Sequence, residues 1–235
     1  MAFLASLKSR ERIPELMDNP ALDPVEHQSA LKALARINRY SKSVGILWPT
    51  IRTLARELGR PLRILDVATG SGDIPTGLIA KATAKKIRLE IAGCDISPTA
   101  IATATARCRE VHFFVHDVLK QPLPTGFDVV ICSLFLHHLS IDEAFILSQR
   151  MKEATNRFVL VNDLVRSRFN YLVVSLICRI LTRSHIVRFD GPASVRSAFN
   201  PDEVSLLAQK AGLEGATIQK RFPCRFLLSW EKCRL

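Results

Sequence analysis

The sequence predicts an α/β fold, with a doubly wound and mainly parallel sheet covered by helices on both faces. Two observations carry this prediction. Between residues 61 and 165, short apolar runs typical of buried strands alternate with helical segments. Four of these runs end in polar residues, and ligand sites in open parallel sheets form at that end of the strands. With 235 residues, 48% of them hydrophobic, the chain is expected to form a single domain with one large core.

Residues 1–60 are expected to form a cap of three helices over the open end of the sheet. Asp23 is the expected N-cap of the second helix, because Pro24 then takes the first helical position. Gly59 marks the end of the third helix, which continues through Pro49. The three expected helices cover about 6–17, 23–40 and 43–58.

Residues 61–165 are expected to form the cofactor-binding core. Its strands are indicated by apolar and β-branched runs, and its helices by Gly, Pro or Ser at their starts. In chain order, the segments are a strand ending at Val67, a helix after Gly72, a strand over 89–95, a helix after Pro98, a strand over 111–115, a strand from Phe127, a helix after Ser140 and a strand over 157–161.

The remaining residues are expected to complete the acceptor side and one sheet edge. Residues 166–200 are interpreted as a lid, with an apolar helical stretch flanked by arginines and a polar loop after it. Residues 201–235 begin with a helix and end with strands near 216–220 and 225–230, which form a hairpin at the sheet edge. The stretch over 169–181 suits a lid over the acceptor, an interfacial membrane helix or core packing, and these alternatives stay open.

The most informative segment runs from Ile64 to Asp73, where a buried strand meets a glycine-bearing turn that opens a helix. This arrangement is typical of a nucleotide-type cofactor site. A dinucleotide fingerprint needs a third Gly or Ala where this chain has Pro75, and a helix N-terminus free for a pyrophosphate where it has Asp73. Asp66 and Asp73 repel a diphosphate but suit a cofactor that carries an ammonium and a sulfonium. The segment therefore predicts an S-adenosylmethionine site.

Two further carboxylates support this prediction. Asp95 ends the second strand, where it is placed to accept both ribose hydroxyls of an adenosyl group. Asp117 closes the third apolar run, with Val118 after it, where a carboxylate reaches the adenine amino group. The fourth run carries apolar and aromatic residues past its strand end, and the four strand ends together predict a single cleft.

In this order and spacing, the motifs resemble those of the class I S-adenosylmethionine-dependent methyltransferases, which implies a Rossmann-like sheet of seven strands. The segment from Leu65 to Ile74 is especially similar to the first motif of the ubiquinone and menaquinone C-methyltransferases. The resemblance covers about 64–163. It departs from the quinone enzymes at 136–139, where this chain has Leu-His-His-Leu, so it implies methyl transfer without fixing a quinone acceptor.

The resemblance also implies how the cofactor is held. Asp66 and the backbone of the glycine turn hold the methionine end, Asp95 binds the ribose, and Ile96 packs on the adenine. Backbone near Ser133 and Leu134 lines the methyl-donor side. The expected cofactor-binding residues are Asp66, Ala68, Thr69, Gly70, Ser71, Gly72, Asp73, Asp95, Ile96, Asp117, Val118, Ser133 and Leu134, with Arg36, Asn38 and Tyr40 as further candidates for the cofactor carboxylate.

His137 and His138 are the candidate catalytic residues, with His138 preferred. Methyl transfer from a sulfonium is an in-line displacement that chiefly needs positioning. An oxygen acceptor such as a phenol must also lose a proton, and a histidine with a near-neutral pKa can remove it. Helix capping or packing beneath the cofactor is the alternative role of both histidines. Asp163, Asp190 and Arg196 are the candidate substrate-binding residues, with helix capping or plain solvation as their alternatives.

Composition bounds the remaining possibilities. The net charge of +11 is spread along the chain without a dense basic run, which favours a diffuse positive surface over RNA binding. The six cysteines form no C-x-x-C pair, so we expect buried apolar fillers and no metal. No apolar run approaches the roughly 20 residues of a membrane span. The first residues also lack the pattern of a signal peptide, and a cytoplasmic protein is expected.

The leading hypothesis is a methyltransferase that acts on a small, hydrophobic aromatic or quinone-like acceptor, in secondary-metabolite or quinone biosynthesis. O-methylation is preferred over C-methylation. An RNA or protein methyltransferase is the second hypothesis, motivated by the basic charge. A non-catalytic S-adenosylmethionine-binding protein is the third. Asp73 and Pro75 argue against a nicotinamide-dependent oxidoreductase. The oligomeric state is left open.

Overall fold

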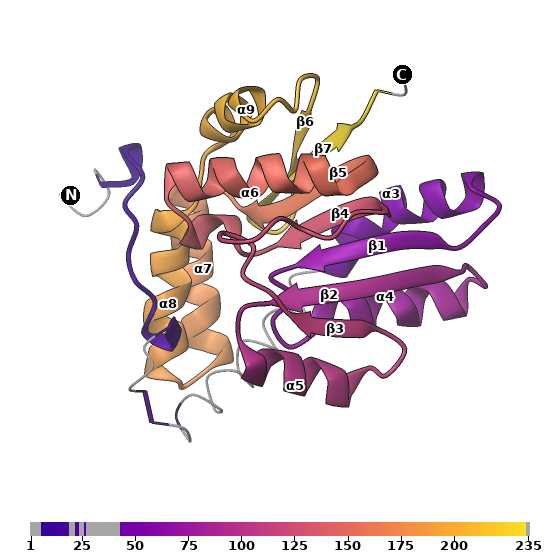
Figure 1. Cartoon of the computed structure of the whole chain (residues 1–235). Coiled ribbons are helices and arrows are strands. Elements are labelled where there is room, and N and C mark those ends of the chain that lie inside the picture. The colour runs from indigo at the N-terminus through magenta and orange to yellow at the C-terminus, as the bar shows by residue number, and fades with distance from the viewer. Residues whose placement is uncertain (1–5, 19–21, 24–25, 27–42, 234–235) are drawn as a thin grey trace.

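The structure, a computed structural model, describes residues 6–18, 22, 23, 26 and 43–233. It is built on one seven-stranded sheet with the strand order β3-β2-β1-β4-β5-β7-β6 (Figure 1). Strands β1 to β5 are parallel, and β7 runs antiparallel between β5 and β6. The predicted Rossmann-like sheet and its edge hairpin are therefore confirmed. The strands are β1 (Leu62–Val67), β2 (Leu89–Asp95), β3 (His112–Val115), β4 (Phe127–Ser133), β5 (Thr155–Leu164), β6 (Thr217–Arg221) and β7 (Arg225–Glu231).

Helices cover both faces of the sheet, because the central strands are apolar on both sides. Ile64 of β1 packs into the core under one helical layer, whereas its neighbours Leu65 and Val67 pack into the core under the other. The first layer consists of α3 (Ser43–Glu57), α4 (Asp73–Ala84) and α5 (Pro98–Arg107), and the second of α6 (Ile141–Ala154) and α9 (Pro201–Lys210). Cys94 and Cys132 are buried in the core, as expected.

Two helices lie beyond the carboxyl ends of the parallel strands, beside the N-terminal segment (Figure 1). These are α7 (Arg168–Leu181) and α8 (His185–Ser197). They approach closely at Gly191, where an added Cβ would lie 2.5 Å from the Cys178 sulfur. The sequence predicted α7 but placed a polar loop over the residues of α8, which was wrong. Gly191 and Pro192 signal a loop, yet the helix continues through both because Gly191 packs tightly against α7.

The predicted helix over 6–17 was also wrong. Only η1 (Ser6–Lys8) and η2 (Leu16–Asp18) form short 3-10 turns there. Between them, backbone amides bond to distant partners instead of to each other: Ile13 N donates to Ser197 Oγ (2.9 Å) and Glu11 N to Arg196 O (3.3 Å). Tertiary hydrogen bonding thus replaces the intrahelical bonds of this segment.

The second predicted helix, over 23–40, lies mostly outside the described residues, as do Arg36, Asn38 and Tyr40. Glu26 N does donate to Asp23 Oδ1 (3.0 Å), as expected of an N-cap. The third predicted helix is confirmed as α3. None of the helices formed by the described residues is long and apolar enough to cross a membrane.

Candidate active site

The turn between β1 and α4 has the backbone shape that the glycines of the first motif require. Gly70 and Gly72 both adopt positive φ, at 53° and 74°. At Gly72 an added Cβ would also lie 2.9 Å from the ring of Phe113, so only glycine fits. The turn is held to the next strand by Thr69 N, which donates to Cys94 O (2.9 Å). Ala68 has a positive φ of 55° without being glycine. The predicted residues from 68 to 72 thus form one compact turn at the end of β1.

Asp95 at the end of β2 connects the turn after β1 with the loop that leads from β2 into α5. Its Oδ2 accepts a hydrogen bond from Gly70 N, and its Oδ1 accepts one from Ser97 N, both at 2.9 Å. A carboxylate has about four acceptor positions, so both oxygens keep capacity for a ligand. Ile96 follows Asp95 and is 63% exposed, which is unusual for a large apolar residue beside a core strand.

Asp66 is the most deeply buried acid of the turn, with 1% exposure. Its Oδ2 accepts a 2.6 Å hydrogen bond from Thr69 Oγ1. Burial raises the pKa of Asp66 to about 7; the Thr69 bond opposes this effect, and the Asp95 and Asp73 carboxylates add to it. Three carboxyl groups are therefore gathered at this end of the sheet, and the charged form of the buried one is disfavoured.

The remaining predicted cofactor residues have identifiable partners. Asp73 forms an ion pair with Arg107 of α5. Asp117 Oδ1 accepts from Leu119 N (3.0 Å), and its other oxygen pairs with Lys120 Nζ (3.2 Å). Burial raises the pKa of Asp117, but the Lys120 ammonium and hydrogen bonds from the backbone of Leu119 and Lys120 together bring that pKa below its usual value. Val118 is buried in the core, so only its backbone is offered to a ligand.

The end of β4 is joined to the end of β5 by one side-chain hydrogen bond and one backbone hydrogen bond. Ser133 Oγ accepts a hydrogen bond from Asn162 Nδ2 (2.8 Å), and Leu134 N donates to Asn162 O (2.9 Å). Leu134 holds a φ of 58°, which is strained for a leucine. The chain then turns into η3 (Leu136–His138), which carries the two candidate catalytic histidines.

His137 is buried between two carboxylates. Its Nδ1 donates to Asp163 Oδ1 at 2.7 Å, and its Nε2 lies 3.7 Å from Glu15 Oε1. Burial by itself lowers the pKa of His137, but Asp163 and Glu15 raise it to about 10. For Asp163 the signs are reversed: burial raises its pKa, and the ion pair with His137 brings it below the usual value. Asp163 thus contacts His137 directly.

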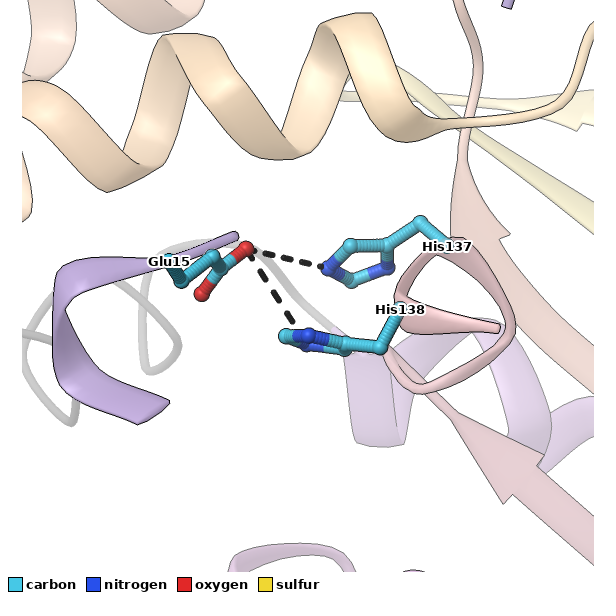
Figure 2. A group of neighbouring side chains, drawn as sticks. All are labelled: Glu15, His137 and His138. Carbon is cyan, nitrogen blue, oxygen red and sulfur yellow. Dashed lines mark ion pairs between the residues drawn. The ribbon is translucent and has the colours of Figure 1, made fainter. Parts of the chain in front are cut away.

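His138 is more accessible, with 27% of its side chain exposed, and its Nε2 lies 4.0 Å from the same Glu15 oxygen (Figure 2). The two imidazole rings are 4.3 Å apart between centroids. A cavity of about 200 Å³ opens next to them, lined by residues 12–15, His137, His138 and Ser197. The structure therefore combines a partly exposed histidine, a buried one and a carboxylate at one cavity.

Asp190 and Arg196, which were predicted to bind substrate, hold the N-terminal segment instead of pointing from a loop. The Asp190 carboxylate accepts hydrogen bonds from Leu16 N (2.7 Å) and Met17 N (3.1 Å), at the start of η2. Arg196 forms an ion pair with Glu11. Both side chains lie on α8 and fix the segment that lines the cavity.

Sequence reasoning missed Glu15 and Arg10. Arg10 Nη2 donates to His137 O (3.0 Å) and Leu139 O (2.5 Å), and its guanidinium lies 3.7 Å from the centre of the Phe199 ring. It therefore attaches the N-terminal segment to η3. The sequence predicted a helix over 6–17 and assigned neither residue a role in the site. No local signal links them to residues far along the chain.

Comparison with known proteins agrees with this arrangement. Residues 64–157 match the family model described as a methyltransferase domain. A stretch of 75 residues is 41% identical to a demethylmenaquinone methyltransferase of Thermus thermophilus, covering 30% of this chain and 32% of the relative. The chain thus matches about a third of the length of that curated relative.

Solved structures share the fold across most of the chain. The plantazolicin methyltransferase BpumL, in complex with a triazolic desmethylPZN analog and SAH, has a TM-score of 0.67 at 14% identity, covering 90% of this chain and 92% of its own. The magnesium protoporphyrin IX methyltransferase of Synechocystis PCC 6803 with bound SAH has a TM-score of 0.56 at 16% identity, with 92% and 90% covered. Residues 64–157 therefore match a methyltransferase domain, and most of the chain shares the fold of these solved methyltransferases.

Proposed function

We propose that this protein transfers a methyl group from S-adenosylmethionine to an oxygen of a small, hydrophobic aromatic or quinone-like acceptor. The observation that carries the proposal is the cavity at His137 and His138, which lies just after β4 of the methyltransferase domain. When bound, S-adenosylmethionine supplies an electrophilic methyl group. The protein has to bind it, orient the acceptor in line with it and take up the acceptor proton.

The residues at the strand ends fit this cofactor. The turn of Gly70 and Gly72 allows a ligand to approach the backbone closely, and Asp66 supplies negative charge for the methionine end. Asp95 keeps free acceptor positions for ribose hydroxyls, and the exposed Ile96 offers an apolar surface for the adenine. We assign Ser133 and Leu134 to the methyl-donor side.

The two histidines have different roles in this proposal. His137 is held by Asp163 and Glu15, and its raised pKa keeps it protonated near neutral pH, so it serves positioning rather than proton removal. His138 is partly exposed at the cavity and is the better candidate for deprotonating an acceptor hydroxyl. Asp190 and Arg196 affect the acceptor through the N-terminal segment that they hold.

A hydrophobic acceptor is supported by α7, which exposes apolar side chains beside this end of the sheet. Phe169 is 71% exposed and Ile180 also 71%, and arginines lie near both helix ends.

We propose that this face of α7 contacts an anionic lipid surface, because basic residues around an apolar stripe complement acidic headgroups. Sedimentation with anionic vesicles, reduced in a Phe169→Ser variant and absent with neutral vesicles, is the expected result. Equal sedimentation with both vesicle types would reject it.

Titration with S-adenosylmethionine and S-adenosylhomocysteine by calorimetry tests the cofactor first. Incubation with phenolic and quinone acceptors, followed by mass spectrometry and NMR of the products, then tests the acceptor class. We expect a methyl ether, formed faster by the wild type than by His138→Ala. A ring methyl would instead support C-methylation, the second candidate, which the similarity to a demethylmenaquinone methyltransferase favours. Methylation of RNA alone, with salt-dependent binding, would overturn both.

A further inference from the structure

We infer that Glu15, His137 and His138 form a binding site for a divalent first-row transition metal ion, for which Zn²⁺ is the natural probe. The three side chains converge from two segments that are far apart in sequence: Glu15 comes from the N-terminal segment and the histidines from η3 (Figure 2). One ligand atom of each residue lies within 4.8 Å of the other two. Two imidazoles and one carboxylate form a donor set that these ions prefer.

The distances suit a shared ion as well as an ion pair. Glu15 Oε1 lies 3.7 Å from His137 Nε2 and 4.0 Å from His138 Nε2, and both separations exceed a normal N–H···O bond of about 3.2 Å at most. Two atoms that each bind one ion at about 2.1 Å are separated by at most about 4.2 Å. The carboxylate oxygen therefore stands at ligand-to-ligand distance from both imidazole nitrogens.

The ligands also have supporting partners. His137 Nδ1 donates to the buried Asp163 carboxylate at 2.7 Å, which directs Nε2 toward Glu15. Metal-bound histidines commonly donate their second N–H to a carboxylate in this way. Glu15 Oε1 in turn accepts a hydrogen bond from Ser194 Oγ of α8. Two of the three ligands are thus oriented by residues that are themselves buried.

The cavity beside the group gives such an ion a chemical role. Its volume of about 200 Å³ holds a small aromatic group or several waters, so coordination positions remain for a hydroxyl. This part of the inference rests on the proposed function. An ion lowers the pKa of a hydroxyl that it contacts, and the proton passes to water. The oxygen lone pair then forms the O–CH₃ bond while the S–CH₃ bonding pair returns to sulfur, giving a methyl ether and a thioether. His138 then serves as a ligand instead of a free base.

The sequence predicted no metal site, and the inference departs from that prediction. The prediction rested on the cysteine spacing, and this group contains no cysteine. Binding must displace the proton that His137 Nε2 otherwise carries, so affinity rises with pH. The simple alternative is an ion pair between protonated His137 and Glu15 without any metal. That alternative predicts no stoichiometric uptake of metal at any pH at which the protein is folded.

Metal binding is tested on the full chain in a Cys233→Ser background, because Cys233 is an exposed competing ligand. After chelator treatment and dialysis at pH 8, Zn²⁺ is titrated by calorimetry, and Co²⁺ by visible absorption, which reports nitrogen and oxygen ligation. We expect one equivalent to bind. Glu15→Gln and His138→Gln should each weaken binding at least tenfold, and Asp163→Asn should weaken it roughly 10–100-fold. His185→Gln, at an exposed histidine of α8, is the matched control and should bind normally.

Absence of Zn²⁺ and Co²⁺ binding by the folded wild-type protein would overturn the inference, as would binding that survives both Glu15→Gln and His138→Gln. Circular dichroism of each variant confirms folding, and the Co²⁺ spectrum of the wild type keeps the test decisive if a variant does not fold. S-adenosylhomocysteine affinity is measured on the same samples. Intact cofactor binding without metal uptake would reject only the metal site, and metal uptake without cofactor binding would reject only the proposed function.

Discussion

Asp66 and Asp163 are equally buried, at 1% exposure, and both lie toward the carboxyl ends of parallel strands of one sheet, yet their surroundings differ. Burial raises the pKa of Asp66 to about 7; two nearby carboxylates add to this rise, and the hydrogen bond from the Thr69 hydroxyl opposes it. Asp163 faces His137, and its pKa falls below the usual value. Among the described residues, no cation is thus one of the groups that shift the pKa of Asp66 on the β1 side of the site, whereas Asp163 on the β5 side faces the His137 imidazolium.

This difference corresponds to what each side is proposed to bind. An uncompensated buried carboxylate stabilises a cationic ligand, and the methionine end of S-adenosylmethionine carries a sulfonium and an ammonium. A carboxylate already paired with an imidazolium is neutralised and instead fixes the ring in place. In a chain with a net charge of +11, we therefore expect local acids rather than total charge to determine which ligand each side attracts.

The largest effect on stability is expected from replacing the carboxylates of Asp163 and Asp66, one at a time. Asp163→Asn leaves His137 buried without its main counter-ion and should lower the free energy of unfolding by about 3 kcal/mol. Asp66→Asn removes a carboxylate whose charge is disfavoured by burial, so at pH 8 stability should stay unchanged or rise. Urea unfolding of both variants measures the contrast. Equal losses would show that the two sides do not differ as described.

The dependence of stability on pH should reflect the ion pair between His137 and Asp163. The pKa of His137 is raised from its ordinary 6.5 to about 10, so its contribution is fully present below pH 6.5 and is lost as the pH rises through 10. Wild-type stability should therefore decline between pH 7 and 10. The decline should be shallower in Asp163→Asn. A parallel decline in both proteins would assign it to other groups.

Cofactor affinity should depend on the β2 end of the site. Asp95→Ala removes a carboxylate that accepts from Gly70 N and Ser97 N, and affinity for S-adenosylhomocysteine should fall roughly 10–100-fold. Glu90→Ala changes an exposed acid on the same strand and is the control. Calorimetry measures both variants, and a similar loss in the two would remove Asp95 from the proposed site.

The two glycines of the first turn allow a finer test within the cofactor side. Both have positive φ, but only Gly72 also faces a side chain at contact distance. Gly72→Ala should cost about 2 kcal/mol of unfolding free energy and Gly70→Ala about 1 kcal/mol. Thermal and urea unfolding compare them, and a larger loss at Gly70 would contradict the geometry.

The smallest effects on stability are expected at the helix caps, which are alike on the two sides of the site. Ser97 caps α5 and Ser140 caps α6, and each Oγ accepts a backbone hydrogen bond of 3.2 Å. Each serine-to-alanine change should cost about 1 kcal/mol. Unequal costs, measured by urea unfolding, would mean that the capped helices are coupled to their sites to different extents.

The cofactor side could be predicted from sequence because its signals are local. Asp66, Gly70 and Gly72 lie within one turn, and Asp95 bonds to residues of that turn across a neighbouring parallel strand. Strand periodicity, glycines and cap residues then predict the element order, which the structure confirms from β1 to β7 except for α8.

The acceptor side could not be predicted to the same extent, because its contacts join distant segments. Glu15, Arg10 and Asp190 acquire their roles only when residues 6–18 meet α8 and η3. One available signal was overlooked. Six of the seven buried positions of α8 recur at helical spacing (Ile186, Val187, Asp190, Ala193, Ser194 and Ser197), whereas Val195 falls outside it and Gly191 and Pro192 interrupt the pattern.

The contact between residues 6–18 and α8 has a consequence for the order in which the protein is made. A ribosome releases the N-terminal segment long before residues 185–197, at about 5–20 residues per second. Gly70, Gly72 and Asp95 can meet while synthesis continues, because all of their partners are early in the chain. Glu15 cannot reach its place until α8 has emerged and has bound Ile13 and Leu16. The nascent chain therefore completes the turn after β1 first and the cavity beside Glu15 last.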